Sequence, residues 1–507
     1  MIPPPRHVFA RSSPWTVAAI TVLALILRLY RIEAQSLWVD EVVTWHAAQV
    51  PIADLLQVRN YYAMAHSLYF ALMHMVLLVS DSEFALRLPS ALFGAFSIPL
   101  LYLVGERWLS RGTGLVAAVL LAVSPLHLYY SQEARPYAVV VFFILFAMVC
   151  LEAMVREPGR TRWRVGFVAS SAAALLSHPV ALAFVPASVL YAALIASRAS
   201  LRRLRGTFAA LLVIIVGLQT VVLPRVHANH PAEPFGLAIA YTGWTFATGF
   251  SLGPSIRELH APDPVQVALA HAPVVALGLL VFGGLAVSGV VRVWSERRRI
   301  AAVVAAWLLL PVLFVVFGSL ATHHPFNVRY VLPAFPAFLL LVGFGVLTLP
   351  KGLWRGGAWA LVLGLSAASI LNYHADPRYQ REDYRSAVGA LRDLARPGDV
   401  VVVSAPYTAI MLDYYNPGPV AVVPFYEPPV MGHPDPVGRP PNDWRSELER
   451  FVADRESFWV LLSRTFHPPV EEELVRFLDE RFERVRDRSW AGTRLVLYSL
   501  PDGRAAR

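Results

Sequence analysis

Two adjacent carboxylates, Asp40 and Glu41, are the residues of this sequence best suited to chemistry. They lie between Trp38 and Trp45, just after the first apolar run of membrane length. A carboxylate can accept a proton from a hydroxyl or bind a cation, and tryptophan favours the membrane–water interface. The pattern predicts half of an active site at a membrane surface. The alternative is a solvated loop or a cap for the helix that follows.

The composition indicates a membrane protein. The 507 residues are 56% hydrophobic and only 16% charged, whereas soluble proteins carry about 25% charged residues. The net charge of +9 does not indicate nucleic-acid binding, because most arginines stand in short clusters between apolar runs, as in cytoplasmic loops. The single cysteine, Cys150, excludes an intramolecular disulfide.

The apolar runs predict about eleven transmembrane helices. A further run, 66–79, is short and begins with a histidine, so we expect it to lie in the outer interface. With this run left out of the count, the arginine-rich loops all fall on the cytoplasmic side with the N-terminus. The acidic pair and everything after residue 372 then lie outside. The predicted spans are near 14–31, 86–106, 114–131, 136–155, 165–178, 179–197, 207–224, 267–294, 300–320, 330–349 and 356–372.

The C-terminal part of the chain has a different pattern. Short apolar runs at 400–404, 420–425, 458–463 and 494–500 alternate with helical patterns. This alternation favours a small α/β domain with a largely parallel sheet. The helical patterns lie at 382–396, 405–415, 442–454 and 469–486. We therefore divide the chain into an α-helical polytopic membrane module, 1–375, and an outer-face soluble α/β domain, 376–507.

Four motifs, taken in their order, resemble the membrane-embedded glycosyltransferases of the GT-C fold. They are LWVDEVVTWHAA at 37–48, EFALRLPSALFG at 83–94, SPLHLYYSQEARPYA at 124–138 and NVRYVLPAFP at 327–336. The similarity is to glycosyltransferase family 39, a group that includes protein O-mannosyltransferases and the aminoarabinose transferase of lipid A. It covers roughly residues 14–350.

The resemblance implies transfer of a sugar from a polyprenyl-phosphate donor to a lipid, glycan or protein acceptor, with inversion, on the outer face of the plasma membrane. In a phosphodiester donor the polyprenyl phosphate is already a good leaving group, so no general acid is required. The reaction does need a carboxylate base that takes the proton of the acceptor hydroxyl as it attacks. It also needs cationic or metal groups for the departing phosphate. By this match Asp40 is the general base, and Glu41 orients the acceptor or tunes the base.

Two further outer segments supply candidate binding residues. Glu133 matches the second acidic position of the fold and would bind a metal or the acceptor, or pair with Arg135. Arg135 and Arg329 suit the lipid phosphate, because guanidinium forks match phosphate oxygens. Arg329 can equally be an interfacial residue that extends to the headgroups. For a divalent metal cofactor, the candidate ligands are Asp40 and Glu133.

Histidines and tyrosines at the outer ends of the spans complete the set. His66 stands where close relatives carry a carboxylate, which removes one acidic metal ligand, although histidine can itself bind metals. His178 and His324 are candidate phosphate or acceptor contacts, and a helix-end role is the alternative for His178. Tyr137 is a candidate sugar platform and Tyr330 a further binding residue, although tyrosines at this depth also anchor helices in the interface.

Two other classes of protein fit part of this pattern. A transporter or flippase of lipid-linked saccharides would also need an outer polar cavity. It would be expected to keep ionisable groups near the bilayer midplane and to show repeated halves, and neither is evident in the sequence. A non-catalytic assembly subunit would give no donor-dependent product.

Overall fold

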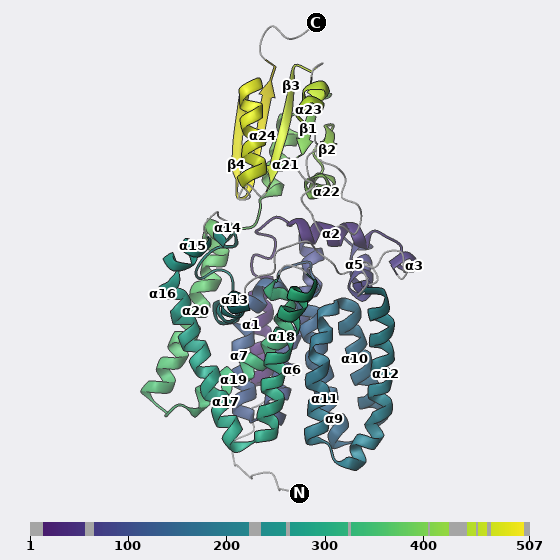
Figure 1. The fold of residues 1–507 in the computed structure, drawn as a ribbon, viewed down its shortest axis with the longest axis vertical. Helices are drawn as coiled ribbons and strands as arrows, with labels where there is room; N and C mark the ends of the chain where they lie inside the picture. Colours follow the sequence, from purple (N-terminus) through teal and green to yellow (C-terminus); the bar gives the residue numbers. More distant parts are fainter. Residues whose placement is uncertain are drawn as a thin grey trace.

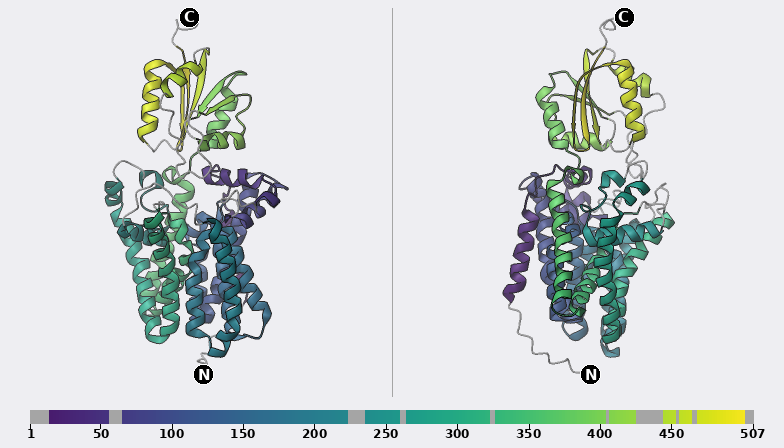
Figure 2. Two further views of the ribbon diagram at one scale, coloured as in Figure 1. Left: turned by 45° about the vertical axis from the view of Figure 1, so that its right-hand side comes forward. Right: turned by 90° about the vertical axis from the view of Figure 1, so that its left-hand side faces the viewer.

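A bundle of helices carries a small sheet on one of its ends (Figure 1). The computed structural model describes residues 14–55, 65–222, 235–259, 264–322, 326–403, 406–424, 444–452, 455–463 and 468–500. Both views of Figure 2 show the sheet at the same end of the bundle. The C-terminal part of the chain contains a small sheet, as predicted, whereas the division of the chain at residue 375 stays a prediction.

Within the described residues, six helical segments are long and apolar enough to cross a membrane. A seventh is obtained when α7 (Arg111–Ala122) and α8 (Pro125–Ser131), which meet at a bend of 58°, are counted as one. The six segments are α6 (Glu83–Trp108), α9 (Tyr137–Arg156), Ala272–Glu296, α18 (Arg298–Thr322), Val328–Thr348 and α20 (Leu353–Ala375). Ala272–Glu296 combines α16 (Ala272–Gly278), η3 (Leu279–Gly283) and α17 (Gly284–Glu296), and Val328–Thr348 combines η4 (Val328–Ala334) and α19 (Phe335–Thr348).

The remaining predicted spans also coincide with helices. They are α1 (Pro14–Leu29), α10 (Thr161–Ser177), η1 (Pro179–Phe184) with α11 (Val185–Ile195), and α12 (Arg198–Val222). The run at 66–79 forms α5 (Ser67–Leu77), which is shorter than a comfortable span. The count of about eleven spans stays a prediction. Other helices are α2 (Val39–Ala48), α3 (Ile52–Leu55), α13 (Phe235–Thr248), α14 (Ile256–Leu259), α15 (Pro264–Ala270) and η5 (Pro377–Tyr379).

The bend between α7 and α8 is stabilised by a buried arginine. Pro125 starts α8 without a backbone N–H to donate, and the Ser124 hydroxyl accepts from the backbone N–H of His127. The carbonyls of Leu121 and Ala122, at the end of α7, accept from the Arg28 guanidinium of α1 at 3.1 and 3.2 Å. Arg28 therefore supplies the donors that a continuous helix would have supplied.

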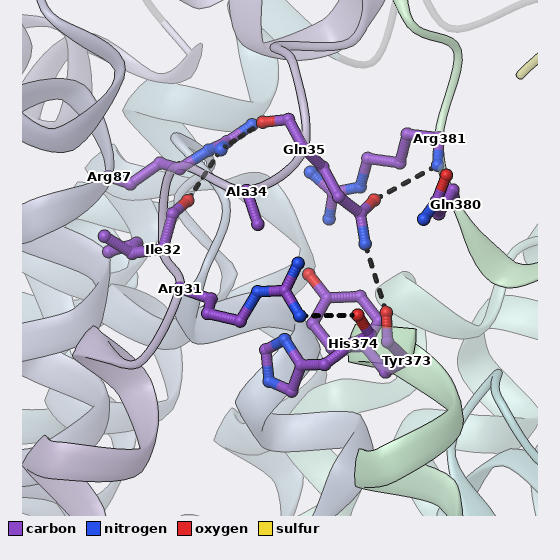
Figure 3. A pocket seen from close by; sticks show the side chains of 9 residues that line it. All are labelled: Arg31, Ile32, Ala34, Gln35, Arg87, Tyr373, His374, Gln380 and Arg381. Carbon is purple, nitrogen blue, oxygen red and sulfur yellow. Dashed lines mark hydrogen bonds between the residues drawn. The ribbon is translucent and has the colours of Figure 1, made fainter. Parts of the chain in front are cut away.

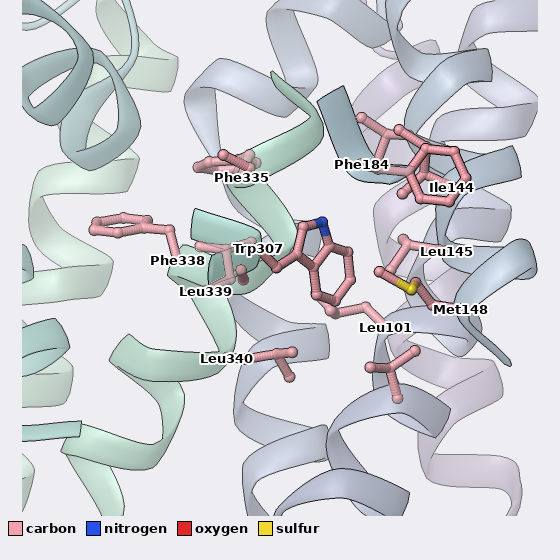
Figure 4. Close-up of a cluster of buried hydrophobic side chains, with 14 of the residues drawn as sticks. Leu101, Ile144, Leu145, Met148, Phe184, Trp307, Phe335, Phe338, Leu339 and Leu340 are labelled. Atoms are coloured by element: carbon pink, nitrogen blue, oxygen red, sulfur yellow. The ribbon is translucent and has the colours of Figure 1, made fainter. Parts of the chain in front are cut away.

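Closely packed apolar side chains hold the bundle together. Trp307 of α18 is fully buried, and its indole N–H donates to the carbonyl of Pro333 at 2.8 Å. Leu101 of α6, Met148 of α9 and Leu340 of α19 belong to the same cluster (Figure 4). The core thus joins helices from both halves of the bundle, which fixes the relative positions of the loops at its ends.

The arginine-rich connections gather at the end of the bundle far from the sheet. Arg156 donates to the carbonyl of Arg107, Arg297 to that of Trp108 and Arg299 to that of Leu194. These connections were predicted to share one side of the membrane, and the structure places them together. Helix α6 has 26 residues and is therefore about 40 Å long. Its first turn lies at the opposite end of the bundle from these connections.

The C-terminal sheet has five strands in the order β2-β1-β3-β5-β4. Its strands are β1 (Val400–Val403), β2 (Ala421–Pro424), β3 (Ser457–Ser463), β4 (Glu483–Trp490) and β5 (Thr493–Ser499). Its helices are α21 (Tyr384–Leu394), α22 (Pro406–Tyr415), α23 (Trp444–Val452) and α24 (Pro468–Arg481). β1 pairs in parallel with β2 and β3, whereas β5 is antiparallel to β3 and β4.

The prediction of a largely parallel sheet is therefore right only for β2, β1 and β3. The error came from β4: its first residues, 483–486, were included in a helical pattern, and the rest of the strand was not predicted as a strand. β4 is an edge strand that is exposed along almost its whole length, so it lacks the apolar alternation that identifies a half-buried strand. Charged residues on such an edge discourage pairing with other chains.

Candidate active site

The first turn of α2 carries the acidic pair. Asp40 and Glu41 lie where the helix dipole favours negative charge. The Glu41 carboxylate accepts from the backbone N–H of Trp38 at 3.3 Å and so caps its own helix. The helix-cap alternative thus applies to Glu41, while Asp40 points elsewhere.

Glu41 is fully buried and bound on both oxygens. Arg87 of α6 grips the carboxylate with two hydrogen bonds of 2.8 and 2.7 Å, the backbone N–H of Ala134 donates at 2.8 Å, and Arg381 at 3.1 Å. Burial acts to raise the pKa of Glu41, but the two arginines outweigh it and the pKa is lowered. Glu41 therefore ties α2, α6 and the segment before α9 together as an ionised carboxylate.

Arg87 was not among the predicted site residues, although its motif had been noted. It is 1% exposed and also donates to the carbonyls of Ile32, Gln35 and Ser36 at 2.7, 2.8 and 3.0 Å. The sequence did contain a signal, since an arginine inside an apolar run must find partners.

Asp40 has the opposite environment to its neighbour. Its side chain is 25% exposed, and its carboxylate accepts from Arg329 of η4 at 2.5 Å. Arg135 lies 3.7 Å from the same oxygen and donates to the Asp40 backbone carbonyl at 3.1 Å. A partly accessible carboxylate between two guanidinium groups is an arrangement that could both accept a proton and bind an anion nearby.

Glu133 lies in the short segment between α8 and α9. It is fully buried, one oxygen accepts from Arg381 at 2.8 Å, and the other has no hydrogen-bond partner among the described residues. Burial raises the pKa of Glu133 to about 7, although Arg381 opposes the rise. This carboxyl group can therefore exchange a proton near neutral pH.

A group of aromatic rings adjoins the arginines. The His178 ring lies 4.7 Å from His66, 5.3 Å from Tyr137 and 5.9 Å from Tyr330, measured between ring centroids. His178 also accepts from the backbone N–H of Val180 at 3.1 Å, which is the predicted helix-end role.

The structure thus brings most predicted site residues into one cluster at the sheet end of the bundle. His324 lies outside the described residues. The cluster contains Asp40, Glu41, His66, Glu133, Arg135, Tyr137, His178, Arg329 and Tyr330.

Arg381, which follows α20, is the second site residue that the sequence analysis missed. Its side chain is 7% exposed and bridges Glu41 and Glu133. It also borders a small cavity of about 30 Å³, shown in Figure 3, together with Gln35, Arg87 and Tyr373. That volume is enough for one or two water molecules. No local pattern in the sequence distinguishes Arg381 from other arginines of the C-terminal part.

The residues present do not fit a divalent metal. Among the described residues, no group of three or more His, Cys, Asp or Glu side chains could hold such an ion. Asp40 and Glu133, the candidate ligands, are each bound to an arginine instead. Positively charged partners oppose cation binding, so no chemical step is assigned to a metal.

Sequence comparisons match one part of the chain to known proteins. Residues 66–224 match the family described as dolichyl-phosphate-mannose-protein mannosyltransferase. A stretch of 186 residues is 31% identical to a putative mannosyltransferase, YycA, of Bacillus subtilis. This match covers 34% of the chain and 27% of the relative, so the chain spans about a quarter of that relative's length.

Two solved structures share the fold over most of the chain. ArnT from Cupriavidus metallidurans bound to undecaprenyl phosphate has a TM-score of 0.56 and 15% identity, over 98% of this chain and 100% of that one. The archaeal oligosaccharyltransferase AglB from Archaeoglobus fulgidus, in complex with an inhibitory peptide and a dolichol-phosphate, has a TM-score of 0.51 and 10% identity, over 88% and 69%. With the motifs above, these likenesses identify the chain as a multi-pass membrane protein of the GT-C fold, similar to glycosyltransferase family 39.

Proposed function

We propose that the protein is an inverting glycosyltransferase that moves a sugar from a polyprenyl-phosphate donor to an acceptor hydroxyl on the outer face of the membrane. The observation that carries this proposal is the partly exposed Asp40 held between Arg329 and Arg135. It supplies a proton acceptor and two phosphate-binding groups within one site. Support comes from ArnT and AglB, whose structures contain undecaprenyl phosphate and dolichol-phosphate.

The proposed reaction is a single displacement at the anomeric carbon. The acceptor oxygen forms a bond to that carbon while the bond to the phosphate oxygen breaks. Asp40 takes the proton of the hydroxyl, and Arg329 and Arg135 stabilise the negative charge of the departing polyprenyl phosphate. Before the donor binds, Arg329 neutralises Asp40. An arriving phosphate gives Arg329 a second anion to bind, which weakens this pairing and makes Asp40 a better base.

Glu41 and Glu133 have separate roles in this proposal. Glu41 has its oxygens occupied by Arg87, Arg381 and backbone N–H groups, so it orients the segments around the site rather than the acceptor itself. One oxygen of Glu133 has no hydrogen-bond partner among the described residues, and Tyr130 is near enough to interact with this carboxyl group electrostatically. Glu133 is placed to accept a hydrogen bond from the incoming hydroxyl.

The orientation in the membrane follows from charge. Because the arginine-rich connections gather at the end of the bundle opposite the cluster, we assign that end and the N-terminus to the cytoplasm. The sheet and Asp40 then lie outside, and the division into 1–375 and 376–507 separates the membrane module from the outer domain.

The test is sugar transfer by the Asp40→Asn variant. Purified protein in lipid would be given a polyprenyl-phosphate sugar and the acceptors extracted from cells, with products identified by mass spectrometry. We expect turnover to fall about 10²- to 10⁴-fold, while binding of polyprenyl phosphate persists. Asp393→Asn, at an exposed position of α21, is the control and should transfer normally.

Persistent transfer in both Asp40→Asn and Glu41→Gln would show that the proposed base is wrong. A transporter or flippase would instead move the lipid-linked sugar between leaflets and give no new glycosidic product in the wild type.

A further inference from the structure

Arg381 enters the site from outside the bundle. It follows α20 and η5, where the chain passes from the last span to the sheet. One amino group of its guanidinium donates to Glu41 at 3.1 Å and the other donates to Glu133 at 2.8 Å. Arg381 therefore joins two carboxylates that arrive from different segments and would otherwise repel each other.

Aromatic rings hold the guanidinium plane as well. The central carbon of Arg381 lies 4.6 Å from the centroid of the Tyr129 ring and 5.7 Å from that of Trp38. Such contacts favour a flat, weakly hydrated cation, and lysine does not reproduce the two-pronged geometry. The position is built for arginine specifically.

The backbone around Arg381 is fixed from two sides. On the bundle side, its own N–H donates to the Gln35 side chain at 3.1 Å, and the Ser36 hydroxyl donates to the carbonyl of Glu382 at 2.6 Å. On the sheet side, Thr493 of β5 donates to the carbonyl of Asp383 at 3.1 Å. The place of the guanidinium therefore depends on the seating of the C-terminal part against the bundle.

We propose that Arg381 is a positioning residue of the transferase, supplied by the C-terminal part of the chain, which holds Glu133 in place for the acceptor hydroxyl. This inference rests on the proposed function. Glu133 has one oxygen bound to Arg381 and the other without a partner among the described residues. The bound oxygen sets the direction of the other, so loss of Arg381 misplaces the acceptor contact and leaves the donor site of Arg329 and Arg135 intact.

The test compares Arg381→Gln with Arg378→Gln. Arg378 lies three residues earlier, is exposed and pairs with Asp376 outside the cluster, so it is a matched control. We expect Arg381→Gln to lower kcat about 10- to 100-fold, as small misplacements of reacting groups do, with KM for the polyprenyl-phosphate sugar within about twofold. Arg378→Gln should match the wild type in both constants.

A double variant separates positioning from simple loss of structure. If Arg381 acts through Glu133, Arg381→Gln with Glu133→Gln should transfer no more slowly than Glu133→Gln alone, because the effects overlap. If the double variant instead lost transfer rate by the product of the two single-variant losses, the inference would be overturned. Should Arg381→Gln fail to fold, Arg381→Lys keeps the charge without the fork, and wild-type kcat in that variant would overturn it too.

The outcome for the wild type distinguishes the two proposals. If the wild type transfers sugar and Arg381→Gln behaves as Arg378→Gln does, the inference on Arg381 fails and the proposed function stands. If the wild type gives no donor-dependent product, the proposed function fails and this inference fails with it.

Discussion

At the scale of single residues, neighbouring positions of the chain have opposite environments. Asp40 and Glu41 are separated by one step of α2, which turns successive side chains by about 100°. Glu41 therefore points into the bundle toward Arg87, whereas Asp40 stays 25% exposed beside Arg329. Burial and partner, rather than residue type, distinguish the organising carboxylate from the proposed base.

The buried pair of Arg87 and Glu41 should be important for stability. Removing one partner of such a pair leaves a buried charge, which costs about 3–5 kcal/mol. In the Arg87→Met variant Arg381 still pairs with Glu41. We therefore expect the free energy of unfolding, measured by chemical unfolding in detergent, to fall by about 3 kcal/mol, the lower end of this range. The control Arg292→Met breaks the exposed pair with Glu296 and should cost less than about 1 kcal/mol. Equal losses in the two variants would contradict this view.

Glu133 should make stability depend on pH. Its pKa is about 7 in the folded protein against an ordinary 4.5. Between these values the unfolded chain has lost the proton and the folded protein still holds it. The free energy of unfolding should therefore fall as pH rises from about 4.5 to about 7, by on the order of 3 kcal/mol, and stay level above.

The measurement is the difference in unfolding free energy between the wild type and Glu133→Gln across that range. Glutamine does not titrate, so the difference isolates the carboxyl group. A difference that is constant with pH would show that Glu133 has an ordinary pKa.

At the scale of elements, two helices of the bundle touch backbone to backbone. A Cβ atom added to Gly289 of α17 would lie 2.1 Å from the carbonyl oxygen of Leu341 in α19, and one added to Gly345 would lie 2.0 Å from that of Leu285. Small residues allow such close approach in membrane bundles. The packing of α17 on α19 in turn sets the position of η4, which carries Arg329.

Gly345→Ala should force these helices apart. We expect the free energy of unfolding to fall by about 1–3 kcal/mol, as is typical of overpacking. Binding of polyprenyl phosphate should weaken as well if Arg329 moves. Gly364→Ala in α20, where an added Cβ meets open space, is the control. It should be neutral or stabilising by up to about 1 kcal/mol. Unfolding in detergent and a lipid-binding assay measure both effects, and equal behaviour of the two variants would argue against backbone contact.

At the scale of the whole molecule, the C-terminal part is packed onto the proposed active site. Met411 of α22 and Tyr384 of α21 share an apolar cluster with Leu37 and Val42. The Tyr415 hydroxyl accepts from the backbone N–H of Leu37 at 2.7 Å and donates to Glu83 at 2.8 Å. The segment that carries Asp40 is thus held between the bundle and the sheet.

The proposed orientation predicts which positions can be labelled from outside. In intact cells, Glu480→Cys at an exposed site of α24 should react with a membrane-impermeant maleimide, and Thr161→Cys at the arginine-rich end should not. Permeabilised cells should show labelling of both. The native Cys150 is buried, so the parent protein is the blank. If only Thr161→Cys were labelled in intact cells, the true orientation would be the reverse of the proposed one.

The sequence by itself determined the local features. Apolar length identified the helical runs, short apolar runs identified four of the five strands, and loop charge grouped Asp40, Glu133 and Arg329 on one side. These features depend on neighbouring residues along the chain, because burial in lipid and the period of a helix or strand are local properties. The fold class followed from them and from the order of the motifs.

Only the tertiary structure decided how these features meet. It joined Glu41 to Arg87 across 46 positions and Glu133 to Arg381 across 248. It also placed the exposed strand β4 beside β5. Ion pairs and edge strands leave no periodic pattern in a sequence, because their partners are chosen by the packing of distant segments and by the need to satisfy charges that this packing buries.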